Sequence, residues 1–360
     1  MRKIEFHNRE KEKKEIMNLL NTEPTLITFI YGPINSGKTE LINNLIKDLP
    51  ESYKVFYINL RGRFIRGYDE FIKVLFDVEH EARYGRIKEF LKPIVNVLPE
   101  SYYGIPIPKD IFLKLFEEKD IEDAFVYIET VLRAFYKNGY APMLVIDELQ
   151  VIGDLKVDEL LIYKLFNFLI RLTKELHLAH VFVITSDSLF IEKVYSEAML
   201  QERCDYLLVD DFDYEITMDF LDSYGFNEHE KEITWNSIGG KPVSLVKVIN
   251  AKRSEKKIED VIGSMRIHRT GEIETRLKLV KELGDEITIG GRRCDVHYEK
   301  LVEALKTFLS RDEVGMNEVD EVSKRYLVKK NILFVDPLTN MMKPQSRLNL
   351  IAIREVMKNV

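Results

Sequence analysis

The stretch TLITFIYGPINSGKT, residues 25–39, decides the fold that this 360-residue sequence predicts. Its first half is a run of β-branched, aromatic and other apolar residues, which is typical of a buried strand. Its second half reads Gly32-Pro33-Ile34-Asn35-Ser36-Gly37-Lys38-Thr39, and the helix-like segment 40–49 comes directly after it. This order matches the phosphate-loop pattern G-x-x-x-x-G-K-[ST], which requires a strand before the loop and a helix after it. We therefore expect a P-loop NTPase domain.

Each fixed position of the loop has a physical task. Glycine lets the backbone curl so that its N–H groups point at phosphate oxygens, and the start of the following helix adds its positive end. We expect Lys38 to reach the β- and γ-phosphates and the Thr39 hydroxyl to ligate Mg²⁺. The predicted nucleotide-binding residues of this stretch run from Gly32 through Glu40. The alternative is a glycine-rich turn that holds no nucleotide.

A second candidate element is the apolar run MLVIDELQ, residues 143–150, which ends in two acids. In a P-loop protein Asp147 would lie beside the loop and hold Mg²⁺, mostly through water. Glu148 would orient or deprotonate the attacking water. The alternative is a strand end with solvated acids. Together with the loop, this pair favours Mg²⁺-dependent hydrolysis over phosphoryl transfer to a small molecule.

Two further residues are weaker catalytic candidates. Thr185 ends the apolar run HLAHVFVITSDS, residues 177–188, where a hydroxyl could sense the γ-phosphate and hold the water. Arg203 comes after a helix-like stretch and could stabilise the transition state, in its own subunit or in a neighbour's. The second case would make the protein a homo-oligomer. The alternatives are an ordinary strand-end hydroxyl and a surface arginine in a local salt bridge.

The rest of the first 210 residues alternates between strand-like and helix-like segments. Expected strands are 25–32, 54–62, 141–150 and 177–188, and expected helices between them are 69–76, 85–98, 121–138 and 157–176. Continuously apolar strands that alternate with helices predict an α/β fold, with a parallel sheet covered by helices on both faces. The segment 77–120 reads as an insertion in this domain.

The pattern changes to helices after residue 210. We expect an α/β domain over 1–210, a helical lid domain over 211–290 and a separate unit over 291–360. The last unit combines helices with a hairpin at 331–344, where Asp336, Pro337 and Asn340 supply turn chemistry. This combination predicts a winged helix-turn-helix.

The composition limits the class of protein. Hydrophobic residues make up 45% and charged residues 31%, which is ordinary for a globular chain. No apolar run approaches the ~20 residues of a membrane span, and the charged start resembles neither a signal peptide nor an anchor. The two cysteines, Cys204 and Cys294, lie far apart and are not spaced like metal ligands. We expect a cytoplasmic protein with no membrane contact.

The charge is unevenly distributed along the chain. The total is −7, with −12 over residues 1–242 and +5 over residues 243–360. A mildly basic C-terminal part is a weak signal for nucleic acid. The candidate DNA contacts are Lys324, Arg325, Lys329 and Lys330 on the expected recognition helix, with Lys343 and Arg347 near the hairpin. The alternative is a winged helix that contacts only protein.

Several marks together resemble the archaeal ATPases of the STAND class, P-loop switch proteins related to AAA+ and origin-recognition ATPases. Besides the P-loop and Arg203, the marks are Phe6-x-Asn8-Arg9-Glu10, Asp147-Glu148-x-Gln150, the acidic-aromatic segment 210–220, Gly239-Gly240-Lys241-Pro242 and the hairpin D-P-x-T-N-x-x-K-P at 336–344. The P-loop and the acidic strand are specific for NTP binding, whereas the other marks are informative only in this order.

The resemblance implies ATP as the nucleotide, with Phe6 and Arg9 near the adenine and Pro242 packed near the base. It also implies a switch in which ATP or ADP sets how the α/β domain and the lid are oriented, acting on a protein partner that the sequence does not identify. Where that class tends toward a T-G-S-S-like run, this chain has Thr185-Ser186-Asp187-Ser188. A negative Asp187 near the γ-phosphate predicts slow hydrolysis. The alternative functions are a DNA-binding regulator or loader with a secondary ATP site, and a small-molecule kinase, for which no substrate-pocket signature is found.

Overall fold

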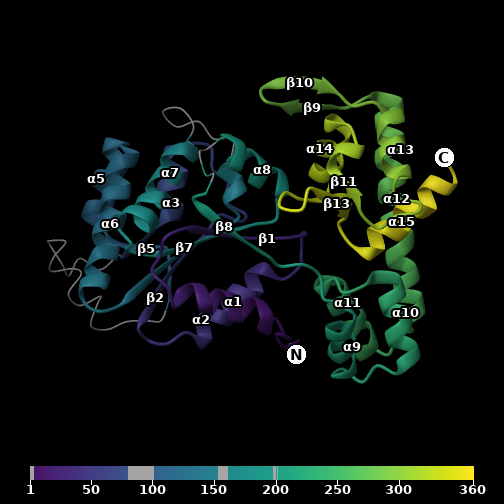
Figure 1. Ribbon diagram of the computed structural model, residues 1–360, viewed down its shortest axis with the longest axis horizontal. Helices are drawn as coiled ribbons and strands as arrows, with labels where there is room; N and C mark the ends of the chain where they lie inside the picture. The colour runs from purple at the N-terminus through teal and green to yellow at the C-terminus, as the bar shows by residue number, and fades with distance from the viewer. Residues whose placement is uncertain (1–3, 80–100, 153–160, 198–199, 201) are drawn as a thin grey trace.

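The computed structural model describes residues 4–79, 101–152, 161–197, 200 and 202–360. Figure 1 shows an α/β unit on the left, a helical unit at the lower right and a C-terminal unit at the upper right. We call these three parts the α/β unit, the lid unit (α9 to α12) and the C-terminal unit (β9 to α15).

A six-stranded sheet forms the centre of the α/β unit, with the strand order β4-β2-β6-β7-β1-β8. Its strands are β1 (Ile27–Tyr31), β2 (Tyr53–Asn59), β4 (Ser101–Tyr103), β6 (Ala141–Asp147), β7 (His180–Thr185) and β8 (Cys204–Leu208). Every neighbouring pair is parallel. The predicted parallel α/β fold is therefore confirmed, and all four predicted strands are present.

Helices cover both faces of the sheet. Those of the α/β unit are α1 (Glu10–Leu20), α2 (Lys38–Asp48), α3 (Tyr68–Leu75), α5 (Lys109–Glu118), α6 (Ile121–Lys137), α7 (Leu161–Ile170), which continues as a π-helical turn (Arg171–Glu175), and α8 (Ser188–Glu197). Alternate residues of β1 point to opposite faces of the sheet. Phe29 packs with α6 and α7 on one face, and Ile30 packs with α1 and α2 on the other. Figure 1 shows α1 and α2 below the sheet and α3, α6 and α7 above it.

The segment 77–120, which the sequence suggested was an insertion, takes part in the sheet. Its β4 pairs with β2 and forms one edge of the sheet. A separate parallel pair joins β3 (Phe76–Glu79) to β5 (Ile105–Pro108). The helix predicted over 85–98 lies outside the described residues, as does the first part of the one predicted over 157–176.

Four helices form the lid unit: α9 (Tyr214–Asp222), α10 (Glu228–Ile238), α11 (Pro242–Arg253) and α12 (Ile258–Leu283). Asn227 and Glu230 form a capping box that starts α10, and Pro242 is the first residue of α11, where its missing N–H costs nothing. The first half of α12 packs in the core of the lid unit, and its second half packs in the core of the C-terminal unit. One long helix therefore joins the two units.

The C-terminal unit begins with a hairpin, β9 (Glu286–Ile289) and β10 (Arg292–Asp295), so the proposed boundary at 290–291 falls in its turn. The remaining elements are α13 (Tyr298–Lys306), β11 (Val314–Gly315), a 3-10 turn (Met316–Glu318), α14 (Glu321–Lys329), β12 (Leu333–Asp336), β13 (Met341–Pro344) and α15 (Arg347–Lys358). The antiparallel order β11-β13-β12 contains the expected hairpin. In the described ranges, no helix combines the length and apolar character that a membrane crossing needs.

Candidate functional site

The loop between β1 and α2 has the conformation that its glycines permit. Gly32 has φ 150°, and a Cβ there would lie 2.2 Å from the Val209 carbonyl oxygen. Gly37 has φ 98° and precedes the first residue of α2. Only glycine tolerates the first position, since the neighbouring strand end leaves no space for a side chain. The loop therefore lies at the carboxyl edge of the sheet, with the start of α2 behind it.

Lys38 is folded back on this loop. Its Nζ donates to the carbonyl oxygens of Gly32 and Pro33, over 2.9 Å in each case. Burial lowers the pKa of Lys38 to about 7, and the nearby Lys241 contributes to the lowering. An anion at the loop would stabilise the charged form of this side chain.

Asp147 ends β6 beside the loop. Its Oδ2 accepts hydrogen bonds from Thr39 Oγ1 over 3.0 Å and from Tyr57 Oη over 2.6 Å. Its Oδ1 is buried and accepts no hydrogen bond within the described part of the chain. Burial raises the pKa of this carboxyl group. A buried carboxylate oxygen without a donor, next to a threonine hydroxyl, is an oxygen-ligand set that fits Mg²⁺. The sequence did not indicate Tyr57, which reaches Asp147 from the neighbouring strand.

Glu148 has a left-handed backbone with φ 63°, and two neighbours hold its carboxylate. Arg61 forms an ion pair with one oxygen and Gln150 Nε2 donates to the other. The amide oxygen of Gln150 in turn accepts from Thr185 Oγ1 over 2.8 Å. Thr185 is fully buried, so it reaches the site through Gln150. Arg61 was not predicted, although it comes after a buried strand at the same sheet edge.

Asp187, which we expected near the γ-phosphate, caps a helix. Its Oδ1 accepts from the backbone N–H groups of Leu189 and Phe190 at the start of α8. The positive end of the helix stabilises that negative charge.

Arg203 is not brought to the P-loop of its own chain. Its carbonyl oxygen accepts from Ile27 N at the amino end of β1, whereas the P-loop lies at the carboxyl end. The two ends of β1 are about 13 Å apart at about 3.3 Å per residue. Of the two alternatives left open for Arg203, action in its own subunit is not favoured, because Arg203 directly precedes β8 at the edge of the sheet opposite the P-loop.

A cavity of about 520 Å³ opens over the loop. Its lining comes from the P-loop and α2 (Ile34, Asn35, Gly37, Lys38, Thr39, Glu40), from the strand ends (Arg61, Glu148, Ser186) and from α11 (Pro242, Val243, Val246). Pro242 approaches Gly37 closely, since a Cβ on Gly37 would lie 4.0 Å from Pro242 Cγ.

Phe6 and Arg9 are absent from the described lining of this cavity. The Arg9 guanidinium is buried and donates to the carbonyl oxygens of Ser36 and Asp210, over 2.7 Å each. It also lies 4.5 Å from the ring centre of Phe212. Arg9 therefore braces the P-loop from behind, and Phe6 packs against the core beside α1.

The lid unit and the C-terminal unit both hold Ile34 of the loop. Lys241 Nζ donates to its carbonyl oxygen over 3.0 Å and pairs with Asp211 at 2.8 Å. The side-chain amide oxygen of Gln345, which comes after β13, accepts from Ile34 N over 3.1 Å. Lys343 pairs with Asp210 nearby. No sequence pattern indicated these contacts, because the segments that they join lie far apart in the chain.

Two of the predicted DNA contacts are engaged with acids. Lys324 is 5% exposed and pairs with Glu321 at 2.6 Å. Arg325 pairs with Glu321 and, at 3.2 Å, with Glu192 of α8. Lys324 and Arg325 are therefore not available as DNA contacts, since both pair with Glu192 of the α/β unit. Of the remaining candidates, Lys329 is exposed, Lys330 is half-buried, and Arg347 donates to Asn236 O over 3.1 Å.

Two family models match the chain. Residues 6–248 match an ATPase domain found predominantly in Archaea. Residues 247–357 match the C-terminal domain of an MJ1010-like, uncharacterized ATP-binding protein. An uncharacterized ATP-binding protein of Pyrococcus abyssi is 44% identical, covering 98% of each chain. Another from Methanocaldococcus jannaschii is 41% identical, covering 99% of this chain and 98% of its own.

Solved structures share the fold. A Walker-type ATPase of Pyrococcus abyssi is 14% identical, with a TM-score of 0.62 over 97% of this chain and 96% of its own. The ORC2 protein of Aeropyrum pernix is 12% identical, with a TM-score of 0.50 over 99% and 94%. At these identities the likeness concerns the fold alone, and it supports the central parallel sheet with a mainly helical C-terminal part.

Proposed function

The chain belongs to the family of ATPase domains found predominantly in Archaea, and from that membership we propose that it is a slow, Mg²⁺-dependent ATPase that works as a nucleotide-controlled switch. The observation that carries the proposal is the contact between Thr39 Oγ1 and Asp147 Oδ2 at 3.0 Å. It joins the end of the P-loop to the acidic strand end, at one wall of a cavity that Glu148 also lines.

Binding of the ATP phosphates falls to the loop and to Lys38. The backbone N–H groups at the start of α2 would donate to the phosphate oxygens. Lys38 would exchange the carbonyl oxygens of Gly32 and Pro33 for phosphate oxygens. Pro242 and its neighbours on α11 would pack against the base, while Arg9 would keep the loop in shape through Ser36. Phe6 would act indirectly, by placing the segment that carries Arg9.

Thr39 and Asp147 would hold Mg²⁺. When bound, the ion would neutralise charge that develops on the phosphates. The unpaired Oδ1 of Asp147 supports this assignment.

Glu148 would act as the base that accepts a proton from the attacking water. Arg61 and Gln150 bond to its two oxygens and hold the carboxylate in place. Each oxygen keeps a second lone pair for the water, but moving the carboxylate toward that water would break these two contacts. This restraint supports slow turnover. Thr185 would position Glu148 through Gln150. For Arg203 we retain only a role in a neighbouring subunit of a homo-oligomer.

The switch would act through the two units that hold Ile34. A nucleotide that reorganises the loop would alter its contacts with Lys241 of the lid unit and Gln345 of the C-terminal unit. The STAND class, the winged-helix identity of residues 291–360, the domain boundaries and the protein partner are part of this proposal. A DNA regulator that reads DNA with the Lys324 face of α14 is not favoured, because Glu192 and Glu321 occupy that face.

Two variants test the proposal. Lys38→Ala is expected to lose ATP binding in titration calorimetry. Glu148→Gln is expected to bind ATP with unchanged affinity. Its rate of phosphate release is expected to fall by a factor of about 10² or more. The matched control is Glu51→Gln, an exposed acid outside the cavity, which should behave like the parent.

Phosphate release is measured without any added acceptor, so turnover also counts against a small-molecule kinase. A Glu148→Gln protein that hydrolyses ATP at the parent rate would remove Glu148 from the mechanism.

A further inference from the structure

A groove runs along one side of α12, between the lid unit and the C-terminal unit. One part, of about 560 Å³, lies among the P-loop, α11, α12 and the start of α15. The other, of about 500 Å³, lies between α12 and the segment 330–332. Both parts are lined by His268, Arg269 and Glu272, so they adjoin. The groove runs along α12 from Ser264 to Leu279, about 22 Å at about 1.5 Å per residue.

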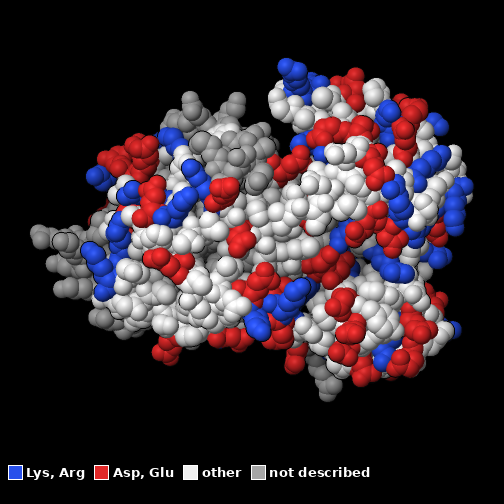
Figure 2. All heavy atoms as spheres, viewed as in Figure 1, with Lys and Arg blue, Asp and Glu red and all other residues white. Residues whose placement is uncertain are grey.

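The lining of this groove is basic in a chain that is acidic overall. Its basic residues are Lys241, Lys247, His268, Arg269, Arg276 and Lys330, and Glu272 is the one carboxylate among the described residues that line it. The whole chain has 53 Lys and Arg against 60 Asp and Glu. We call these lining residues the basic groove. Figure 2 shows basic side chains gathered along the right-hand edge of the molecule, where Figure 1 places α12 and the C-terminal unit.

Two of the basic residues are committed to the fold. Arg269 donates to Asn349 Oδ1 over 2.9 Å and to the Asn331 carbonyl oxygen over 2.8 Å, and pairs with Glu272 at 2.7 Å. Lys241 is buried between the P-loop and Asp211. Arg269 therefore lies at the base of the basic groove, where its hydrogen bonds to Asn331 and Asn349 hold α12 against the C-terminal unit.

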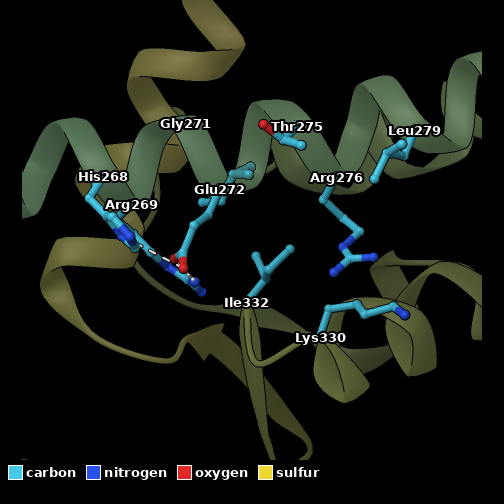
Figure 3. Close-up of a pocket in the computed structure, with 10 residues that line it drawn as sticks. His268, Arg269, Gly271, Glu272, Thr275, Arg276, Leu279, Lys330 and Ile332 are labelled. Atoms are coloured by element: carbon cyan, nitrogen blue, oxygen red, sulfur yellow. Dashed lines mark hydrogen bonds and ion pairs between the residues drawn. The ribbon is translucent and has the colours of Figure 1, made fainter.

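The other basic side chains remain accessible along its length. Lys247 is exposed on α11 at the P-loop end, and His268 is exposed in the middle. Figure 3 shows Arg276 pointing from α12 toward the segment of the C-terminal unit that carries Lys330, in the second part of the groove. Lys330 Nζ forms an ion pair with the carboxylate of Asp285 at 3.8 Å. The same carboxylate also interacts with Arg276, which contacts the Tyr326 hydroxyl, so one acid partly offsets these two cations, both of which stay half-exposed.

We propose that the basic groove binds the sugar–phosphate backbone of a nucleic acid strand. The accessible cations are distributed along the groove and do not converge on one point, which suits a linear polyanion better than a small ion. Ser264, Thr275 and Asn331 add neutral hydrogen-bonding groups between them, and such side chains are frequent phosphate contacts. At about 3.4 Å of axis per phosphate, 22 Å corresponds to about six phosphates.

Recognition in this groove is independent of base sequence. None of the described residues that line it is Phe, Tyr or Trp, so His268 is the one ring among them on which a base could stack. The site differs from the Lys324 face of α14, which is covered. It also does not depend on ATP hydrolysis, although its first part touches Ile34 of the P-loop.

The test is fluorescence anisotropy of the full chain with labelled 20-nucleotide strands of two unrelated sequences. Both strands are expected to bind at 50 mM salt with similar affinity. With about three phosphate contacts, the logarithm of the association constant should fall with the logarithm of salt with a slope of about −2. Arg276→Gln combined with Lys330→Gln should weaken binding at least about tenfold and reduce that slope by about 1.4.

The matched control removes two lysines outside the groove, Lys114→Gln with Lys278→Gln. Both are 71% exposed and sit near a carboxylate on the same helix at 3.8 Å, so the change in net charge is the same. This control should bind like the parent. Lys38→Ala should also keep oligonucleotide binding, which separates this inference from the ATP site.

Three results would overturn the proposal: no binding at 50 mM salt, an equal loss in the control variant, or stronger competition by polyglutamate than by unlabelled DNA. The last result would assign the basic groove to an acidic polypeptide. Unchanged ATP binding in calorimetry by the two double variants is expected to show that a loss of oligonucleotide binding does not come from unfolding.

Discussion

The side-chain nitrogen of Lys38 donates hydrogen bonds to two carbonyl oxygens of its own loop. Burial lowers the pKa of this group to about 7. Because the unfolded chain holds this proton to a pKa near 10.4, the native state binds it more weakly. The destabilisation that results is fully present below about pH 7, and it is relieved as the pH rises toward 10.4. The same lysine must be charged to bind a triphosphate.

The lowered pKa of Lys38 predicts that binding of Mg²⁺-ATP is accompanied by proton uptake. At pH 8.5 most Lys38 side chains are neutral, so binding of Mg²⁺-ATP should take up most of a proton, whereas at pH 6.0 it should take up little. Calorimetric titration in buffers of different ionisation enthalpy measures this uptake. Equal uptake at the two pH values would show that the pKa of Lys38 is not depressed in the free protein.

Gly32 is required by its contacts as well as by its conformation. A methyl group at this position would lie 2.2 Å from the Val209 carbonyl oxygen, so Gly32→Ala should lower the free energy of unfolding by about 1–3 kcal/mol and abolish ATP binding. Gly263→Ala is the control, because a methyl group meets nothing within 4 Å in helix α12. That change should raise stability by about 0.5–1 kcal/mol. Urea unfolding midpoints of the two variants that move in the same direction would contradict this account.

At the scale of elements, the segment after β13 reaches the P-loop. Gln345 accepts the Ile34 N–H of the P-loop, and we propose that a bound phosphate competes for this donor. It also donates from its amide nitrogen to Leu333 O over 3.0 Å. Docking of the C-terminal unit and occupation of the loop would then be coupled through one amide.

Gln345→Met keeps the volume of the side chain but removes its acceptor. We expect ATP to bind about 2- to 10-fold more tightly, because a hydrogen bond worth about 0.5–1.5 kcal/mol no longer competes for that amide. Lys343→Met is the control, since it breaks the pair with Asp210 in the same interface without touching Ile34. If both variants change the calorimetric affinity equally, the effect arises from general loosening of the interface.

At the scale of the whole molecule, the cavity is shared between units. The α/β unit supplies Lys38, Thr39 and Glu148, and the lid unit supplies Pro242 and Val243. A ligand held by both units restrains their relative motion and stabilises the folded chain in proportion to its affinity. Thermal unfolding therefore reports on the ligand and on the metal.

Saturating ATP with Mg²⁺ should raise the melting temperature by several degrees. A ligand at a concentration of 100 Kd stabilises the folded state by about 2.7 kcal/mol. Removal of Mg²⁺ with a chelator should reduce that rise. In Asp147→Asn the rise with ATP alone should persist, and the extra gain from Mg²⁺ should disappear. A chelator that lowers the melting temperature equally in the parent and in Asp147→Asn would place the metal elsewhere.

The sequence by itself determined the parts of this protein that depend on neighbours in the chain. The P-loop, the strand before it and Asp147-Glu148 could be located because glycine spacing, apolar runs and helix signals are local properties. The parallel order could be inferred from the alternation of strands and helices. The strands β4 and β8 escaped this approach because neither is a continuous apolar run: β4 is Ser-Tyr-Tyr, and β8 is Cys-Asp-Tyr-Leu-Leu with a polar residue inside it. The position of Arg203 at the amino edge of the sheet was missed for that reason.

Only the tertiary structure decided which distant side chains meet at the site. Tyr57 and Arg61 reach the acids because β2 lies beside β6 in the sheet, and Gln345 reaches Ile34 because the C-terminal unit folds back across 311 residues of chain. The burial of Lys324 against α8 and the basic groove along α12 arise in the same way. Hydrogen bonds and ion pairs of this kind act over a few ångströms, so the packing of whole units decides them, and no local sequence pattern contains that information.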